Sequence, residues 1–113
     1  MVFNSDGTSA GTTLGTSSNG TFSFTTVGNS NSFLIGQYGG SHNNLDYTTT
    51  GNGNTYFSLQ SGTVAGANGH SQTVTTSGNN NNLSVTQTGT AQQTLSLNLT
   101  GSSNTITVTQ GPN

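Results

Sequence analysis

The sequence predicts an all-β chain that folds as a β-solenoid with two strands in each coil. Four times along the chain, a glycine is followed three residues later by asparagine and six residues after that by glutamine. A repeat of 23 to 27 residues is typical of a stack in which each coil buries its apolar face against the next. The composition favours strands, because Thr and amide residues are abundant, Lys and Arg are absent, and there is one proline. The copies are Gly28/Asn31/Gln37, Gly51/Asn54/Gln60, Gly78/Asn81/Gln87 and Gly101/Asn104/Gln110.

Residues 1–20 precede the first repeat and are rich in Gly, Ser and Thr. This composition is typical of a flexible arm. Terminal segments of this kind become ordered when something holds them, so we expect the arm to pack on the solenoid or on a neighbouring subunit. The sequence therefore divides into an N-terminal arm, residues 1–20, and a solenoid, residues 21–113.

Each repeat contains two short strands, one before the glycine and one after the asparagine. Apolar residues and Thr recur six, four and two positions before the glycine, and two and four positions after the asparagine. Alternation with period two places these side chains on one face of each strand, which predicts the core. The five positions are Phe22/Leu45/Gln72/Leu95, Phe24/Tyr47/Val74/Leu97, Thr26/Thr49/Thr76/Leu99, Phe33/Tyr56/Leu83/Ile106 and Ile35/Ser58/Val85/Val108.

The repeated Asn and Gln are expected to form ladders along the stack. Coils of a parallel solenoid lie about 4.8 Å apart, so identical amides in neighbouring coils can bond to one another. Such bonds matter because a buried amide is costly unless it has partners. The four extra residues between Gln60 and Gln72 predict an enlarged turn at residues 61–71.

The charge balance excludes several function classes. With no Lys or Arg, the chain cannot neutralise phosphates, which argues against nucleic acid and against anionic membrane surfaces as partners. No apolar run approaches the length that membrane insertion needs, and no cysteine is present for a disulfide or a thiolate metal site. The remaining expected partner is a second copy of the chain, with other virion structural proteins as a further possibility.

The pattern Gly-x-x-Asn, five residues, Gln resembles the curlin repeat of curli fibre subunits. The segments Gln37–Gly40 and Gly101–Gln110 are the most similar, and the resemblance covers about residues 20–111. It implies a two-stranded β-solenoid that stacks end to end into amyloid-like extracellular fibres. The chain is also similar to curlin-like solenoid segments of phage virion proteins. Curlin repeats begin with a serine, at positions where this chain has Gly20, Asn43, His70 and Gln93.

Candidate chemistry is sparse, and we expect no enzymatic activity, metal site or cofactor. His42, Asp46 and His70 are the only internal groups suited to acid–base or metal work, and we expect them in a turn, on an outward face and at a loop end. Two histidines fall short of the four ligands of a closed metal site. The Gly- and Asn-rich turns lack the aspartates that calcium-binding turns use, so we interpret them as turn formers.

Two outward surfaces are candidates for binding. Leu34, Phe57 and Leu59 are expected to lie side by side on the second strands, and we interpret them as an interface with a subunit or with the arm. On the first strands, one outward column holds Thr25, Thr48, Thr75 and Asn98. Flat threonine arrays resemble the ice-binding surfaces of some antifreeze proteins, although Thr also suits any exposed strand.

The sequence as a whole predicts a non-enzymatic structural protein that self-assembles. The open strand edges of a solenoid are templates for more strands, and only Pro112 resembles a stop. No signal peptide is visible, which favours a phage virion component, either a capsid decoration or a fibre subunit. The alternative is a secreted curli-like fibre at the bacterial surface, and a more remote one is an ice-binding or adhesive solenoid.

Overall fold

The computed structural model describes residues 2–6, 9–15, 20–39, 42–62 and 69–111. These residues form ten strands and no helix. The strands are β1 (Val2–Asp6), β2 (Ser9–Gly15), β3 (Thr21–Val27), β4 (Asn31–Tyr38), β5 (Asn44–Thr50), β6 (Thr55–Ser61), β7 (Ser71–Ser77), β8 (Asn82–Thr88), β9 (Thr94–Thr100) and β10 (Thr105–Gln110).

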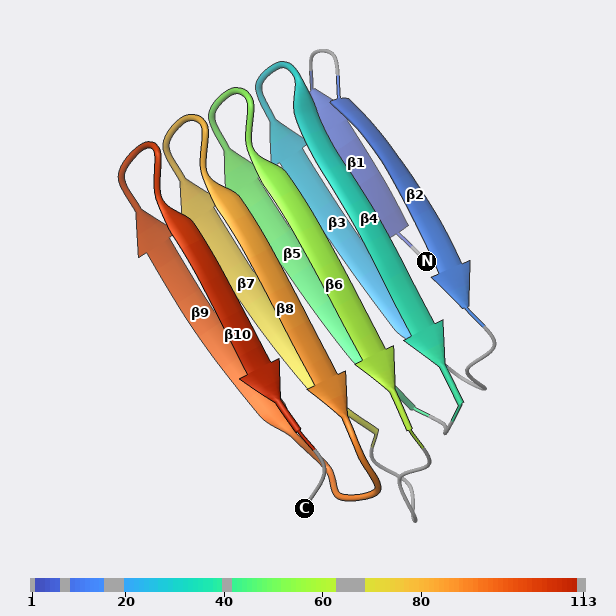
Figure 1. The fold of residues 1–113 in the computed structure, drawn as a ribbon. Helices are drawn as coiled ribbons and strands as arrows, with labels where there is room; N and C mark the ends of the chain where they lie inside the picture. Colours follow the sequence, from blue (N-terminus) through green and yellow to red (C-terminus); the bar gives the residue numbers. More distant parts are fainter. Residues whose placement is uncertain (1, 7–8, 16–19, 40–41, 63–68, 112–113) are drawn as a thin grey trace.

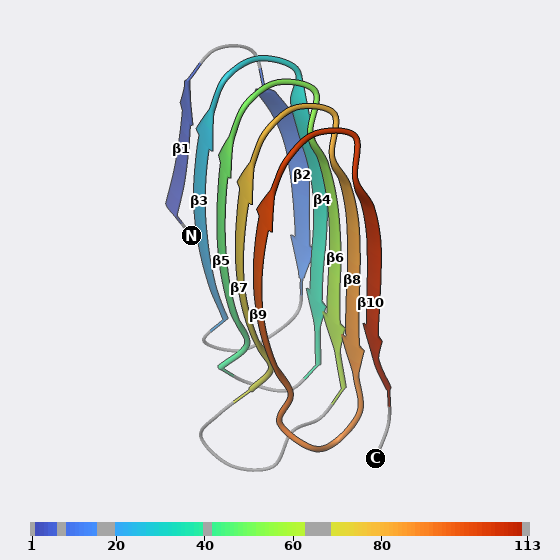
Figure 2. The ribbon, with the colours of Figure 1, turned by 90° about the vertical axis from the view of Figure 1, so that its left-hand side faces the viewer.

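The strands alternate between two parallel five-stranded sheets. One sheet has the order β1-β3-β5-β7-β9, and the other has the order β10-β8-β6-β4-β2 (Figure 1). Seen from the side, the sheets are two facing layers, and the chain passes from one layer to the other after every strand (Figure 2). The predicted all-β solenoid with two strands per coil is therefore confirmed. We number the coils 1 to 5, from β1 and β2 to β9 and β10, so that the four repeats are coils 2 to 5.

Coil 1 comes from the segment predicted as an arm. The strand β1 pairs with β3 over five residues, and β2 pairs with β4 over seven. The described part of the arm thus extends both sheets by one strand, and coil 1 lies at the opposite end of the stack from coil 5 (Figures 1 and 2).

The register between coils follows the alignment of the repeats. Phe24 pairs with Tyr47, and Gln60 pairs with Gln87 although 27 residues separate these two glutamines. The four extra residues therefore lie outside the strands. They fall within the predicted enlarged turn, of which residues 63–68 lie outside the described residues.

The core is one continuous cluster of side chains stacked between the sheets. Tyr47 and Tyr56 stack with their ring centroids 4.1 Å apart and an angle of 3° between the ring planes, and Phe24 and Phe33 stack at 4.9 Å. These rings belong to coils 2 and 3, while aliphatic side chains dominate coils 4 and 5. The buried apolar residues are Phe24, Phe33, Ile35, Leu45, Tyr47, Tyr56, Val74, Leu83, Val85 and Leu99.

The polar residues at predicted core positions are buried as well. Thr26, Thr49 and Thr76 point into the stack in one column and are each at most 1% exposed. Gln72 is fully buried, and its Oε1 accepts hydrogen bonds from the hydroxyls of Tyr56 at 2.8 Å and Ser58 at 2.7 Å. Burial raises the pKa of Tyr56 well above its usual value, because the tyrosinate would have to form away from water. Burial raises the pKa of Tyr47 for the same reason.

Candidate functional site

The asparagines of the repeat form a continuous hydrogen-bonded ladder along the stack. The backbone N and the Nδ2 of Asn54 both donate to the Oδ1 of Asn31, at 3.0 and 3.1 Å. The same Nδ2 donates to the carbonyl oxygen of Gly78 at 2.9 Å. Asn81 bonds to Asn54 in the same way, and Asn104 bonds to Asn81 through its backbone N and its Nδ2. The Oδ1 atoms of Asn31, Asn54 and Asn81 therefore each accept two bonds from the following coil.

The glutamines form a second ladder on the other side of the core. Gln37 Nε2 donates to Gln60 Oε1 at 2.6 Å, Gln60 Nε2 donates to Gln87 Oε1 at 3.1 Å, and Gln87 Nε2 donates to Gln110 Oε1 at 2.6 Å. Gln60 Nε2 also bonds to the carbonyl oxygen of Asn44 at 3.0 Å. Because every amide nitrogen donates toward coil 5, the ladder has a direction, and its last free donor belongs to coil 5.

The turn glycines allow neighbouring coils to approach closely. At Gly78, where φ is +133°, an added Cβ would lie 1.9 Å from the carbonyl oxygen of Gly101. A side chain would therefore push coils 4 and 5 apart. At Gly101 the nearest atom to an added Cβ is Asn104 Nδ2, 3.2 Å away. The space over Gly101 is open because no described coil follows coil 5.

At the coil 5 end of the described stack, the groups that elsewhere bond to a following coil have no described coil beyond them. The edges of β9 and β10 have no neighbour among the described strands. The Oδ1 of Asn104 and one Nε2 hydrogen of Gln110 are at the positions that bond to a following coil elsewhere in the stack. Four of the five inward apolar side chains there are only partly buried, unlike those of coils 3 and 4, and the fifth, Leu99, is buried. The four partly buried side chains are Leu95, Leu97, Ile106 and Val108.

The coil 1 end differs in its ladder residues. Register places Ser9 beside Asn31 and Gly15 beside Gln37. Coil 1 therefore carries a serine and a glycine where coils 2 to 5 carry the ladder amides. At both ends of the described stack, the outermost strands have one edge without a described neighbour. Only at the coil 5 end does the outermost coil carry the Gly, Asn and Gln of the repeat.

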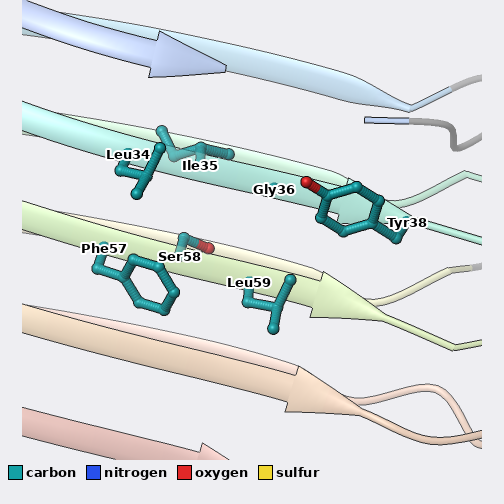
Figure 3. A pocket seen from close by; sticks show the side chains of 7 residues that line it. All are labelled: Leu34, Ile35, Gly36, Tyr38, Phe57, Ser58 and Leu59. Carbon is teal, nitrogen blue, oxygen red and sulfur yellow. The ribbon is translucent and has the colours of Figure 1, made fainter. Parts of the chain in front are cut away.

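A side patch lies on the outer surface of β4 and β6, where the sequence predicted it. Leu34 and Phe57 are register partners and are 43% and 37% exposed, and Leu59 is half-buried beside them. The structure adds Tyr38, 39% exposed, whose ring covers the buried Gly36: an added Cβ there would lie 2.6 Å from Tyr38 Cε2. We call Leu34, Tyr38, Phe57 and Leu59 the side patch; they surround a shallow hollow of about 160 Å³ (Figure 3).

Sequence reasoning missed a third buried polar column. Asn43, His70 and Gln93 occupy the position eight residues before each turn glycine and are at most 8% exposed. The backbone N of His70 donates to Asn43 Oδ1 at 2.9 Å, and Gln93 Nε2 donates to the carbonyl oxygen of Thr88 at 2.9 Å. The alignment with the curlin repeat had placed these residues at one position of the coil, but their burial was not predicted because three different polar residue types occupy that position.

A fourth column, on the exposed turns, was missed as well. The backbone N of Asn29 donates to Asn52 Oδ1, and that of Asn52 donates to Asn79 Oδ1, both at 2.8 Å. The backbone N of Asn79 continues the series to Ser102 Oγ at 3.1 Å. The turns are thus tied together from coil 2 to coil 5, with the last acceptor in coil 5.

The candidate chemical residues are dispersed. His42 and Asp46 are exposed, in keeping with the turn and the outward face expected for them. His70 was expected at a loop end, and its complete burial was not predicted. Within the described ranges, no three His, Cys, Asp or Glu side chains gather closely enough to hold a metal ion. The described residues also include no helix that could cross a membrane.

The threonine column is arranged as the sequence predicted. Thr25, Thr48, Thr75 and Asn98 are successive register partners on the outer surface of the first sheet. Ice binding by this column stays a prediction, which a thermal hysteresis measurement would test.

A comparison with models of known protein families, with curated proteins and with solved structures finds no match to this chain. The resemblance to curlin repeats therefore stays an expectation from the repeat pattern.

Proposed function

We propose that this chain is a non-enzymatic structural protein that assembles by adding further β-coils to the end of its solenoid. The observation that carries the proposal is the coil 5 end, where two strand edges and two amide ladders stop together. A strand edge with unpaired N–H and C=O groups is a template for another strand. The ladders add the requirement that the new coil carry matching amides.

The coil 5 end also offers apolar surface to an incoming coil. Four of its inward aliphatic side chains are half-buried, whereas the counterparts in coil 4, Val74, Leu83 and Val85, are at most 1% exposed. Completing their burial contributes on the order of 1 kcal/mol for each side chain. The edge also lacks the protection that lysine gives to natural sheet edges, since the chain contains none.

Unlimited stacking of this kind fits an extracellular curli-like fibre at a bacterial surface. The side patch supports a second candidate, a closed oligomer formed side by side, as expected of a phage capsid decoration or fibre subunit. Contiguous exposed apolar side chains on an otherwise polar surface mark such interfaces. A C₃ or C₂ arrangement would bury Leu34, Phe57 and Tyr38 of each copy without engaging the ends.

Sedimentation velocity over a range of concentrations, combined with negative-stain electron microscopy, separates the two candidates. Ile106→Lys places a charge on the open end, and Phe57→Thr removes the ring from the side patch while leaving the end intact. Filaments of the native chain that Ile106→Lys abolishes and Phe57→Thr preserves support stacking. Discrete particles with the opposite response support the closed oligomer. A native chain that stays monomeric at every concentration contradicts the closed oligomer. It contradicts stacking as well if the variant S9N/G15Q, which gives coil 1 the ladder residues, also stays monomeric.

A further inference from the structure

We propose that the coil 5 end binds coil 2, residues 21–38, of a second copy, and that coil 1 of that copy is a cap that must be displaced first. This inference rests on the proposed stacking function and adds which coil docks and what regulates docking. The partner is a second copy because only a coil with the repeat pattern completes the ladders that stop at coil 5.

The hydrogen bonds of the two ladders define which donors and acceptors the docking coil must supply. In every step of the Asn ladder, the following coil provides a backbone N and an Nδ2 to the preceding Oδ1, and a glycine carbonyl to the preceding Nδ2. In every step of the Gln ladder, it provides an Oε1. The coil 5 end therefore requires an Asn over Asn104, a Gln over Gln110 and a glycine over Gly101.

Coil 2 meets each of these requirements at the repeat spacing. Gly28, Asn31 and Gln37 have the same separations as Gly101, Asn104 and Gln110, so all three pairs come into register together. In the column on the exposed turns, each backbone N donates to a side-chain oxygen of the following coil. Asn29 of the second copy would supply that acceptor to the backbone N of Ser102. The inward aromatic side chains of coil 2 would cover the half-buried aliphatic side chains of coil 5. These aromatic residues are Phe22, Phe24 and Phe33.

Coil 1 cannot take this place. By register it carries Ser9 and Gly15 where the coil 5 end requires Asn and Gln. A serine lacks the amide nitrogen of the Asn ladder, and a glycine offers no side-chain acceptor to Gln110 Nε2. Stacking a complete copy on coil 5 would therefore end both ladders at the junction and leave amide groups of Asn104 and Gln110 without partners.

Coil 1 is a terminal coil, and one of its two strand pairs is short among the described residues. The strand β1 pairs with β3 over five described residues, whereas β3–β5, β5–β7 and β7–β9 each pair over seven, as β2–β4 does. Phe22 of coil 2, on the side that coil 1 covers, is only partly buried. Terminal coils with weaker contacts open before the rest of a stack does. Coil 1 thus covers the docking surface of coil 2 and can be removed from it.

A reversible lock tests the cap in the full chain. Asn4 and Thr25 are register partners across β1 and β3, and parallel neighbours lie at a separation that a disulfide spans. The native chain has no cysteine, so N4C/T25C forms one defined bond between coil 1 and coil 2. The matched control is T48C/T75C, which places the same bond between coils 3 and 4, where no opening is required.

Elongation is followed by light scattering and electron microscopy with each variant oxidised and reduced. We expect oxidised N4C/T25C to elongate at least about tenfold more slowly than its reduced form, from the lost ladder bonds alone. T48C/T75C should elongate equally in both states. Equal elongation of N4C/T25C in both states overturns the cap while leaving the stacking function in place.

A second variant tests the case in which coil 1 of the native chain is never displaced spontaneously. Ser9→Asn with Gly15→Gln gives coil 1 the ladder residues, so this chain should stack without displacing it. If the native chain stays monomeric and S9N/G15Q forms filaments, the cap is supported. If both stay monomeric, the proposed function and the cap are both wrong.

Discussion

Replacing Asn54 by alanine should destabilise the folded chain far more than the same change at Asn104. The Oδ1 of Asn54 accepts from Asn81 N and Nδ2, at 3.0 and 3.1 Å, and its Nδ2 donates to Asn31 Oδ1 and Gly78 O, at 3.1 and 2.9 Å. Asn54→Ala therefore removes four hydrogen bonds. The Asn104 side chain makes one ladder bond, from Nδ2 to Asn81 Oδ1 at 3.0 Å, so Asn104→Ala removes one.

At about 1 kcal/mol net for each bond, Asn54→Ala should lower the free energy of unfolding by about 4 kcal/mol and Asn104→Ala by about 1 kcal/mol. With a urea m-value of about 2 kcal/mol per molar, the midpoints should fall by about 2 M and about 0.5 M. Urea unfolding followed by far-UV circular dichroism, at concentrations where the chain is monomeric, measures both. Equal shifts, or no shift for Asn54→Ala, would refute the ladder as a source of stability.

Three further predictions follow from the stack and its surface. Gly78→Ala should cost about 2 kcal/mol more than Gly101→Ala in the same unfolding assay, since only the first places its Cβ 1.9 Å from a carbonyl oxygen of the following coil; equal costs would contradict the open space over Gly101. Burial raises the pKa of Tyr47 and Tyr56 above the usual value of 10.0, so their contribution to stability is fully present below about pH 10 and lost as pH rises above it. A pH titration of thermal unfolding checks this, and Tyr47→Phe should flatten the alkaline loss; an unchanged profile would count against it. Leu34→Thr should change the unfolding free energy by less than about 1 kcal/mol, because the side chain is 43% exposed, yet reduce binding of the dye ANS to the side patch; unchanged dye binding would mean that the patch is not an accessible apolar surface.

The repeat pattern was sufficient to predict the strands of coils 2 to 5 and their register. Alternation around Gly-x-x-Asn fixes which side chains point inward, and a one-residue slip would turn Leu45 or Val85 outward. The ladder residues follow from the same register, since identical residues at identical offsets must stack. The pairing of Gln60 with Gln87 could also be predicted despite their longer spacing, because the extra residues fall between strands.

Coil 1 could not be predicted in this way. It has no Gly-x-x-Asn turn and few apolar residues, so local sequence gives no strand signal there. Its strands pair with β3 and β4, whose edges supply partners for any backbone that lies alongside them. The position of the Tyr38 ring over Gly36 was equally out of reach, because it depends on side-chain packing across one strand and not on the period of the repeat.

Fibre diffraction from an aligned sample of assembled chain tests the central claim most directly. If copies stack coil upon coil, the spacing of about 4.8 Å between coils must run parallel to the filament axis and give a meridional reflection. A reflection at this spacing perpendicular to the axis would mean that the copies join side by side through the side patch, and it would contradict stacking through the coil 5 end.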